Sequence, residues 1–160
     1  NLFDSSIVRY YSEYYKLLTG ETSAEALQLE YANAFWPSAE EAGTVKGRSL
    51  INGMPASAPV SEADIYNAIG EDLSRIVETV LSVFESTPPE LIGDIYEDGI
   101  LIAGGGALIR GIDMYIYRET GVKCRIAQDP LGCVARGTSR AFHLRDQLRN
   151  GFERISVFSS

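Results

Sequence analysis

The stretch Ile100-Leu-Ile-Ala-Gly-Gly-Gly-Ala107 decides the fold. Its first four residues are wholly apolar and follow Gly99, which is typical of a short strand buried on both faces of a sheet. Three glycines come next and lead toward a helix expected over residues 113–120. Such a turn lets the backbone approach a ligand closely and directs helix N–H groups at an anion or a ring edge. Strand-to-helix turns also use glycine for geometry alone, so nucleotide binding and a plain tight corner are both open.

The glycine turn matches neither of two common phosphate-binding motifs. Residues 104–110, GGGALIR, contain no G-K-[S/T] and therefore exclude a P-loop. They also lack the G-x-G-x-x-G spacing of dinucleotide-binding folds. A ligand at this turn would be contacted mainly through the backbone and close packing.

The residues before this strand predict helices. Helical spacing is shown by Leu73, Ile76, Val77, Val80, Leu81 and Phe84. Thr87-Pro88-Pro89 should end that helix, and a short helical turn should follow over residues 91–95. A separate short helix is expected to open at Ser61, with Asp64 in its first turn. We place the boundary between a small α+β lobe and an α/β portion near Gly70.

The first part of the chain predicts helices and a hairpin. An amphipathic helix is expected from Ser6 to Leu18, and a second from residue 22 to about residue 33. Extended runs over residues 44–51 and 54–60 flank Asn52-Gly53, which is a strong hairpin signal. Two prolines in the second run indicate an edge strand.

After the glycine turn, we expect a strand over residues 122–127 and a last helix from Asp129 to about Leu148. The fold class is therefore α/β, with a small α+β lobe (residues 1–69), an α/β portion (70–127) and a C-terminal helix and tail (128–160). The α/β portion has only two strands in sequence, and two parallel strands make a poor sheet. This shortage suggests that further strands belong to the same sheet.

Composition excludes several classes of function. The formal charge is −8, which argues against a nucleic-acid footprint and against a polybasic membrane anchor. No apolar stretch approaches the ~18 residues of a membrane span, and the start does not have the form of a signal peptide. His143 is the only histidine, so a histidine-based triad or multi-histidine metal site is impossible within these residues. Cys124 and Cys133 are expected to be small buried hydrophobic residues in a reducing compartment.

Glu25 has two interpretations. Thr22-Ser-Ala-Glu25 has the form of a capping box, in which the acid satisfies a free N–H group at the start of a helix. Alternatively, the Glu25 carboxylate accepts a hydrogen bond from a ribose hydroxyl or an adenine amine. No pair of carboxylates is placed for acid–base catalysis, so we assign no catalytic residue and no metal ligand.

Several longer motifs, in order along the chain, resemble the MreB-type bacterial actins. The segments that carry the resemblance are Ile7–Tyr10, Gly20–Glu25, Val45–Arg48, Thr87–Asp113, Glu119–Val122 and Asp129–Thr138. The resemblance covers nearly the whole chain and fades after about residue 144. It implies the actin and ribonuclease-H-like architecture, with ATP in the cleft between two domains. Residues 1–69 would then be subdomain IIB and residues 70–127 the later part of IIA.

The resemblance also implies a nucleoside site. One part is the glycine turn, here Gly104, Gly105, Gly106 and Ala107. The other is the helical turn from Glu25 through Ala26 and Leu27 to Gln28. Gln28 stands where the family has lysine, and it can donate a hydrogen bond but supplies no positive charge. Magnesium would bind only in the intact protein, because the family's phosphate loops and catalytic residues precede residue 1.

The function implied by the resemblance is that of a cytoplasmic cell-shape filament protein. Its partners would be further copies of itself, the adaptor RodZ and the cell-wall synthesis machinery, with the membrane reached through other regions or partners. The 160-residue chain alone is expected to have no ATPase activity. The alternatives are another ATPase of the actin superfamily, such as a sugar kinase or a heat-shock-type chaperone, or a nucleotide-free interaction module.

Overall fold

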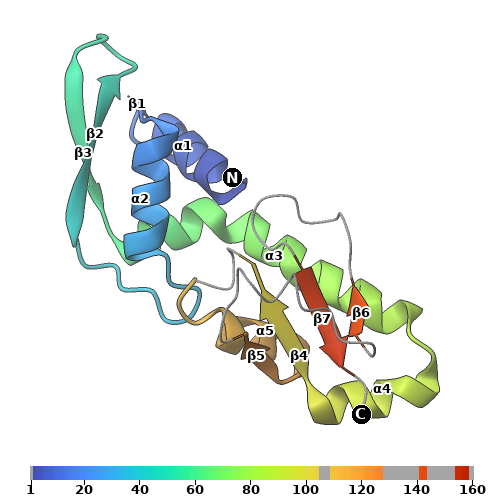
Figure 1. Cartoon of the computed structure of the whole chain (residues 1–160). Helices are drawn as coiled ribbons and strands as arrows, with labels where there is room; N and C mark the ends of the chain where they lie inside the picture. The colour runs from blue at the N-terminus through green and yellow to red at the C-terminus, as the bar shows by residue number, and fades with distance from the viewer. Residues whose placement is uncertain (1, 105–108, 128–140, 144–153, 159–160) are drawn as a thin grey trace. The chain divides into compact units, whose positions relative to one another are not determined.

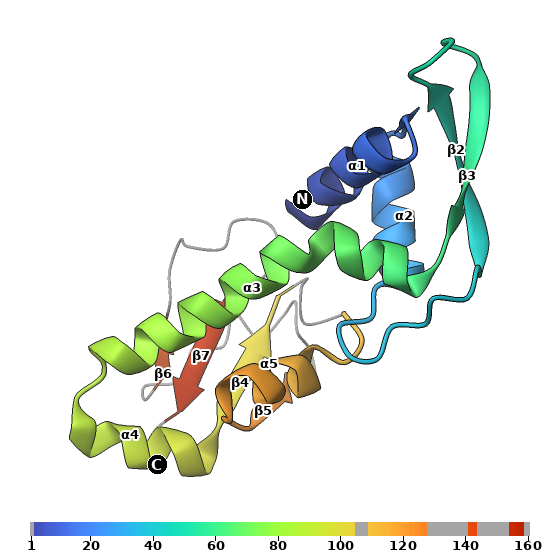
Figure 2. The ribbon, with the colours of Figure 1, turned by 180° about the vertical axis from the view of Figure 1, so that it is seen from behind.

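The computed structural model describes residues 2–104, 109–127, 141–143 and 154–158, with side chains as far as residue 127. Figures 1 and 2 show the ribbon from opposite sides. The chain divides into two compact units, Asn1–Asp72 and Leu73–Ser160, and each is described by itself. Among the described residues, no helix is long and apolar enough to cross a bilayer.

The first unit contains two short helices beside a three-stranded antiparallel sheet (Figure 1). Its elements are α1 (Leu2–Tyr14), β1 (Leu17–Leu18), α2 (Glu21–Tyr31), β2 (Gly43–Ser49), β3 (Pro55–Val60) and the start of α3 (Glu62–Ser86). The sheet order is β1-β2-β3, and the β2–β3 register runs from Gly43 opposite Val60 to Arg48 opposite Pro55. The predicted hairpin and the edge position of its second strand are therefore confirmed.

The end of α1 differs from the prediction. The expected helix to Leu18 is wrong, because α1 ends at Tyr14 and Lys16 has a left-handed φ of 50°. Leu17 then pairs with Ser49 across the β1–β2 ladder and is only 2% exposed. A helix continued to this point would forfeit both the ladder hydrogen bonds and the burial of that leucine.

The two helices predicted on either side of Gly70 are one helix. α3 runs without a break for 25 residues, so the prediction of two separate helices is wrong. A glycine inside a helix costs only about 1 kcal/mol relative to alanine, which the surrounding apolar repeat can offset. Thr87 and the following prolines end the helix as expected, and α4 (Pro89–Asp98) follows.

A capping box opens α3. The Ser61 hydroxyl oxygen accepts the Asp64 N–H at 3.1 Å, and the Asp64 carboxylate accepts the Ser61 N–H at 2.9 Å. Two helix-terminal donors are thus satisfied reciprocally. The carboxylate also accepts the hydroxyls of Tyr10 and Tyr15 at 2.8 and 2.9 Å, which ties α1 to the start of α3.

The second unit is built on a mixed sheet. Its strands are β4 (Ile100–Ala103), β5 (Cys124–Ile126), β6 (Ala141–His143) and β7 (Arg154–Phe158), in the order β5-β4-β7-β6. β4 pairs in parallel with β5, as the predicted strands require, and antiparallel with β7. The predicted last helix is wrong at residues 141–143, which form β6; the rest of that prediction lies outside the described residues.

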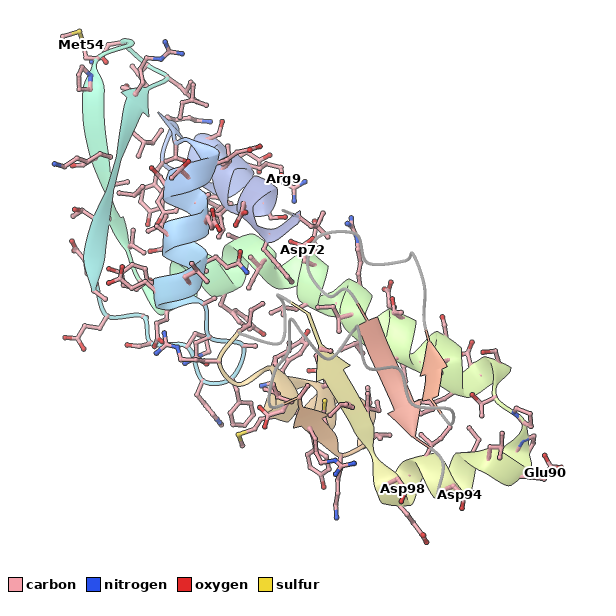
Figure 3. All side chains as sticks on the ribbon, viewed as in Figure 1. Arg9, Met54, Asp72, Glu90, Asp94 and Asp98 are labelled. Atoms are coloured by element: carbon pink, nitrogen blue, oxygen red, sulfur yellow. The ribbon has the colours of Figure 1, made fainter. Side chains whose placement is uncertain are left out.

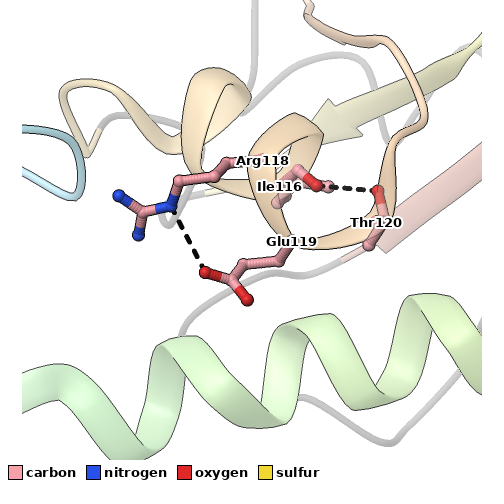
Figure 4. Close-up of polar contacts among 4 residues, drawn as sticks. All are labelled: Ile116, Arg118, Glu119 and Thr120. Atoms are coloured by element: carbon pink, nitrogen blue, oxygen red, sulfur yellow. Dashed lines mark hydrogen bonds and ion pairs between the residues drawn. The ribbon is translucent and has the colours of Figure 1, made fainter.

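The core of the second unit lies between this sheet and the helices of the same unit. Ile100 and Ile102 on β4 are completely buried, as are Ile112 and Ile116 on α5 (Ile112–Thr120). α5 ends as predicted at Gly121, whose φ is 73°. In its last turn the Thr120 hydroxyl donates to the Ile116 carbonyl at 2.7 Å, next to the exposed Arg118–Glu119 ion pair (Figure 4).

Cys124 is only partly buried, whereas the sequence predicted a buried residue. It is a free cysteine of intermediate exposure. Burial, together with the nearby charge of Asp113, raises the pKa of its thiol to about 12. The thiol is therefore protonated at neutral pH and is a poor nucleophile. Cys133 lies outside the described residues.

Candidate functional site

The first half of the candidate site lies on α2. Helical geometry puts Glu25 and Gln28 on adjacent turns of the same face. Glu25 and Ala26 are exposed, whereas Leu27 and Gln28 are 6% and 7% exposed. The Gln28 side chain is thus held within the packing of the first unit, and the Glu25 carboxylate is presented to solvent next to it.

The capping interpretation of Glu25 is wrong. α2 begins at Glu21, its N-cap is Gly20, and no side-chain hydrogen bond caps it. Thr22 therefore lies inside the first turn, two residues after the N-cap, so its hydroxyl does not act as the cap. A capping box does occur in this chain, but between Ser61 and Asp64 at the start of α3.

The surroundings of Glu25 are acidic. Burial raises the pKa of the Asp4 carboxyl on α1, and the charges of Glu25 and Glu21 raise it further. Asp4 is 5% exposed, so these carboxylates influence one another through the packed α1–α2 interface. Such a surface repels a phosphate chain but can accept hydrogen bonds from neutral hydroxyl and amine donors.

The second half of the candidate site is the carboxyl end of β4. Gly104 is buried and follows the strand with a φ of 92°, a conformation that residues with a Cβ adopt only under strain. β4 has a parallel neighbour on one side and an antiparallel one on the other. Ligands of open α/β sheets bind outside the carboxyl ends of strands, which is where this glycine lies. Gly105, Gly106 and Ala107 lie outside the described residues.

The two halves belong to different units, since residues 25–28 lie in the first and Gly104 in the second. Within the described ranges no group of three or more histidine, cysteine or acidic residues could hold a metal ion. Sequence analysis did not single out Thr19, which precedes α2. Thr19 is 4% exposed, and its hydroxyl has no hydrogen-bond partner among the described residues. An isolated threonine in an apolar stretch gives no sequence signal of this kind.

The arrangement of helices and strands described above is an actin-like α/β fold. Among solved structures, MreB5 of Spiroplasma citri bound to ADP is 35% identical, with a TM-score of 0.79 over 84% of this chain and 41% of that one. The same protein bound to AMPPNP matches equally well. A MamK double helical filament, 22% identical with a TM-score of 0.63, has the same fold.

Sequence relatives identify the family within this class. The family model described as MreB/Mbl protein matches residues 1–150. The cell shape-determining protein Mbl of Bacillus subtilis is 36% identical over 91% of this chain and 44% of its own length. MreB of Escherichia coli is 38% identical over 90% of this chain and 42% of its own. The chain belongs to the MreB/Mbl family, and it spans less than half the length of these relatives.

Proposed function

We propose that the chain is part of an ATP-binding bacterial actin whose filaments control rod cell shape and guide cell-wall synthesis. The observation that carries this proposal is the match of residues 1–150 to the MreB/Mbl family, whose relatives are named for determining cell shape. The similarity to MreB5 structures bound to ADP and AMPPNP supports a nucleotide as the ligand. A sugar kinase or a heat-shock-type chaperone has no such support.

In this proposal the chain contacts the nucleoside end of ATP. The exposed Glu25 carboxylate accepts a hydrogen bond from a ribose hydroxyl or the adenine amine, with Ala26 and Leu27 in the same helical turn. Gln28 is buried beside it, and its packing restricts the rotamers of that turn. The acidic surroundings suit these neutral donors and disfavour the phosphates.

The glycine turn supplies the other contact. The left-handed Gly104 turns the chain sharply at the end of β4, and a Cβ-free backbone allows close approach of a ring or ribose. We assign the same backbone role to Gly105, Gly106 and Ala107. ATP supplies a hydrolysable phosphoanhydride; the residues that would hold its phosphates and magnesium are not among those assigned here.

We further propose that the intact protein works in the cytoplasm against the membrane, with its own copies, RodZ and the cell-wall synthesis machinery as partners. Residues 1–69 correspond in this proposal to subdomain IIB, and residues 70–127 to the later part of IIA. The support for these assignments is the match of the chain to the MreB/Mbl family.

Nucleotide titration of the full-length parent protein tests the proposal. ATP should bind and promote filaments visible by electron microscopy and by sedimentation. Glu25→Ala should weaken ADP binding by about tenfold, because a hydrogen bond to a charged group contributes about 1.5 kcal/mol. Glu30→Ala, an exposed acid on the same helix, is the matched control and should bind normally.

Two results would contradict the proposal. Absence of ATP binding by the parent would favour the nucleotide-free interaction module. Phosphorylation of an added small substrate, without filaments, would favour a kinase of the same superfamily. Equal ADP affinity for Glu25→Ala and Glu30→Ala would remove Glu25 from the site while leaving the filament function in place.

A further inference from the structure

An exposed tryptophan lies in the loop between α2 and β2 (Figure 1). Trp36 is 79% exposed, although the large apolar surface of an indole gains much from leaving water. Its φ of 57° is left-handed, which is rare and strained for a bulky residue. The Phe35 ring meets the indole edge to face, with ring centroids 5.7 Å apart. Most of the indole surface nevertheless stays open to solvent.

The loop that carries this tryptophan is held at both ends by the Glu62 carboxylate, at the start of α3. This carboxylate accepts the Asn33 side-chain N–H at 3.3 Å and the Ser38 N–H at 3.1 Å, on either side of the tryptophan. The Ser38 carbonyl in turn accepts the Ala63 N–H at 2.9 Å. The surroundings therefore impose the strained conformation of the residue between them. A loop fixed in this way loses little conformational entropy when a partner binds.

The sequence around the tryptophan is acidic. Residues 17–45 contain no lysine or arginine. The acids of this stretch are Glu21, Glu25, Glu30, Glu40 and Glu41. Glu40 and Glu41 are exposed, and no ion pair within the described ranges involves either carboxylate. A span of five residues covers at most ~18 Å, so one extended peptide can reach both the indole and these two carboxylates.

The chemistry of this surface favours a cationic partner. Among aromatic rings, an indole attracts a guanidinium group most strongly. Carboxylates beside the indole can accept paired hydrogen bonds from the same kind of group. An apolar pocket on a partner would instead leave both carboxylates desolvated without a countercharge. A phosphate-bearing ligand would be repelled.

We propose that Trp36, Glu40 and Glu41 form a docking surface for an arginine-containing segment of a partner protein. One guanidinium group stacks on the indole, and neighbouring arginines pair with the two carboxylates. Tryptophan and arginine are the residues that most often dominate binding between proteins, which fits this pairing. The inference goes beyond the proposed function, because it requires neither a nucleotide nor a filament.

Tryptophan emission of the 160-residue chain tests the inference, because Trp36 is its only tryptophan. A synthetic hexa-arginine peptide should change this emission and protect the indole from quenching by acrylamide. Hexalysine, which has the same charge, should bind about threefold more weakly, because an ammonium group cannot stack on the ring. Added salt should weaken both interactions.

Charge variants separate this surface from general attraction to an acidic chain. Glu40→Gln/Glu41→Gln should raise the hexa-arginine concentration at half of the emission change about fivefold. Glu90→Gln/Glu97→Gln is the matched control, because it removes two exposed acids from α4 (Glu90 is shown in Figure 3). This control should change the midpoint by less than about twofold.

A glycine variant separates binding from packing. Trp36→Gly removes the indole and suits the left-handed conformation, so the melting temperature should not fall. Calorimetric titration of this variant should show an affinity for hexa-arginine that is about fivefold lower. The preference for hexa-arginine over hexalysine should also disappear.

Several outcomes would overturn the inference. Unchanged Trp36 emission with hexa-arginine would exclude the site, and equal midpoints for the two charge variants would reduce it to general attraction. Equal binding of hexalysine would remove the stacking on the indole. A lower melting temperature of Trp36→Gly would assign the indole a packing role. Self-association that is lost in Trp36→Gly without peptide would identify a second copy of the chain as the occupant.

Discussion

Asp64→Ala is expected to destabilise the first unit by about 3 kcal/mol, because this carboxylate joins the start of α3 to α1. It accepts the Tyr10 hydroxyl and both the N–H and the hydroxyl of Ser61, and all three hydrogen bonds are part-buried. A fourth hydrogen bond, from Tyr15, is exposed to solvent. Alanine removes all four acceptor contacts and the acid half of the capping box.

The size of the expected loss of stability follows from how far each of these hydrogen bonds is buried. A part-buried hydrogen bond contributes about 1 kcal/mol to stability, and three of them give the stated value. The exposed Tyr15 contact adds almost nothing because water replaces it. For a chain of this length the change should lower the melting temperature by roughly 6–12 °C.

Urea unfolding followed by circular dichroism would measure this loss. Glu78→Ala, an exposed acid on the same helix, is the matched control and should stay within about 0.5 kcal/mol of the unaltered chain. A double-mutant cycle with Tyr10→Phe should give a coupling of about 1 kcal/mol. A loss for Asp64→Ala no larger than that of the control, or zero coupling with Tyr10, would refute the reasoning.

Three further predictions concern buried groups. Thr19→Val should stabilise the chain by about 1 kcal/mol, because the buried Thr19 hydroxyl lacks a hydrogen-bond partner among the described residues. Thr79→Val should instead destabilise the chain, because it removes a 2.8 Å hydrogen bond. Thermal melts should therefore show a higher melting temperature for the first variant and a lower one for the second. Gly47→Ala should cost about 1–3 kcal/mol in urea unfolding, since a Cβ there would meet a backbone carbonyl of β1. Burial raises the pKa of Tyr10 and Tyr11 above 10, so the native state favours their neutral form. The stability that these two hydroxyls contribute is complete below about pH 10 and is lost as the pH rises further. The tyrosinate absorbance of Tyr10 and Tyr11, taken as the difference between the unaltered chain and the variant Tyr10→Phe/Tyr11→Phe, should therefore appear only with alkaline unfolding; such a difference at about pH 10 in a folded chain would contradict this.

Local patterns were sufficient to predict the elements that depend on nearby residues. The apolar run Ile100–Ala103 predicted β4, and Asn52-Gly53 predicted the hairpin. The motifs around them predicted the family, which the comparisons confirm. The candidate site residues remain a prediction, since no observation tests their contact with a nucleotide.

The errors arose where distant residues determine local structure. Leu17 leaves the helical pattern because it pairs with Ser49, which lies more than 30 residues away. The two helices predicted before and after Gly70 are one, because the apolar repeat continues on both sides of this residue. Thr22 and Glu25 match a capping box by spacing, but the helix had already begun at Glu21. The sequence of β7 contains no pattern that distinguishes a strand from an irregular C-terminal tail.

The pairing of β4 with β7 has a consequence for proteolysis and truncation. β7 occupies one side of β4, and β5 the other. A chain cut before Arg154 would leave the wholly apolar strand Ile-Leu-Ile-Ala with an open row of N–H and carbonyl groups. Such an edge recruits strands from other molecules, so loss of the last seven residues should produce insoluble aggregates rather than a slightly shorter domain.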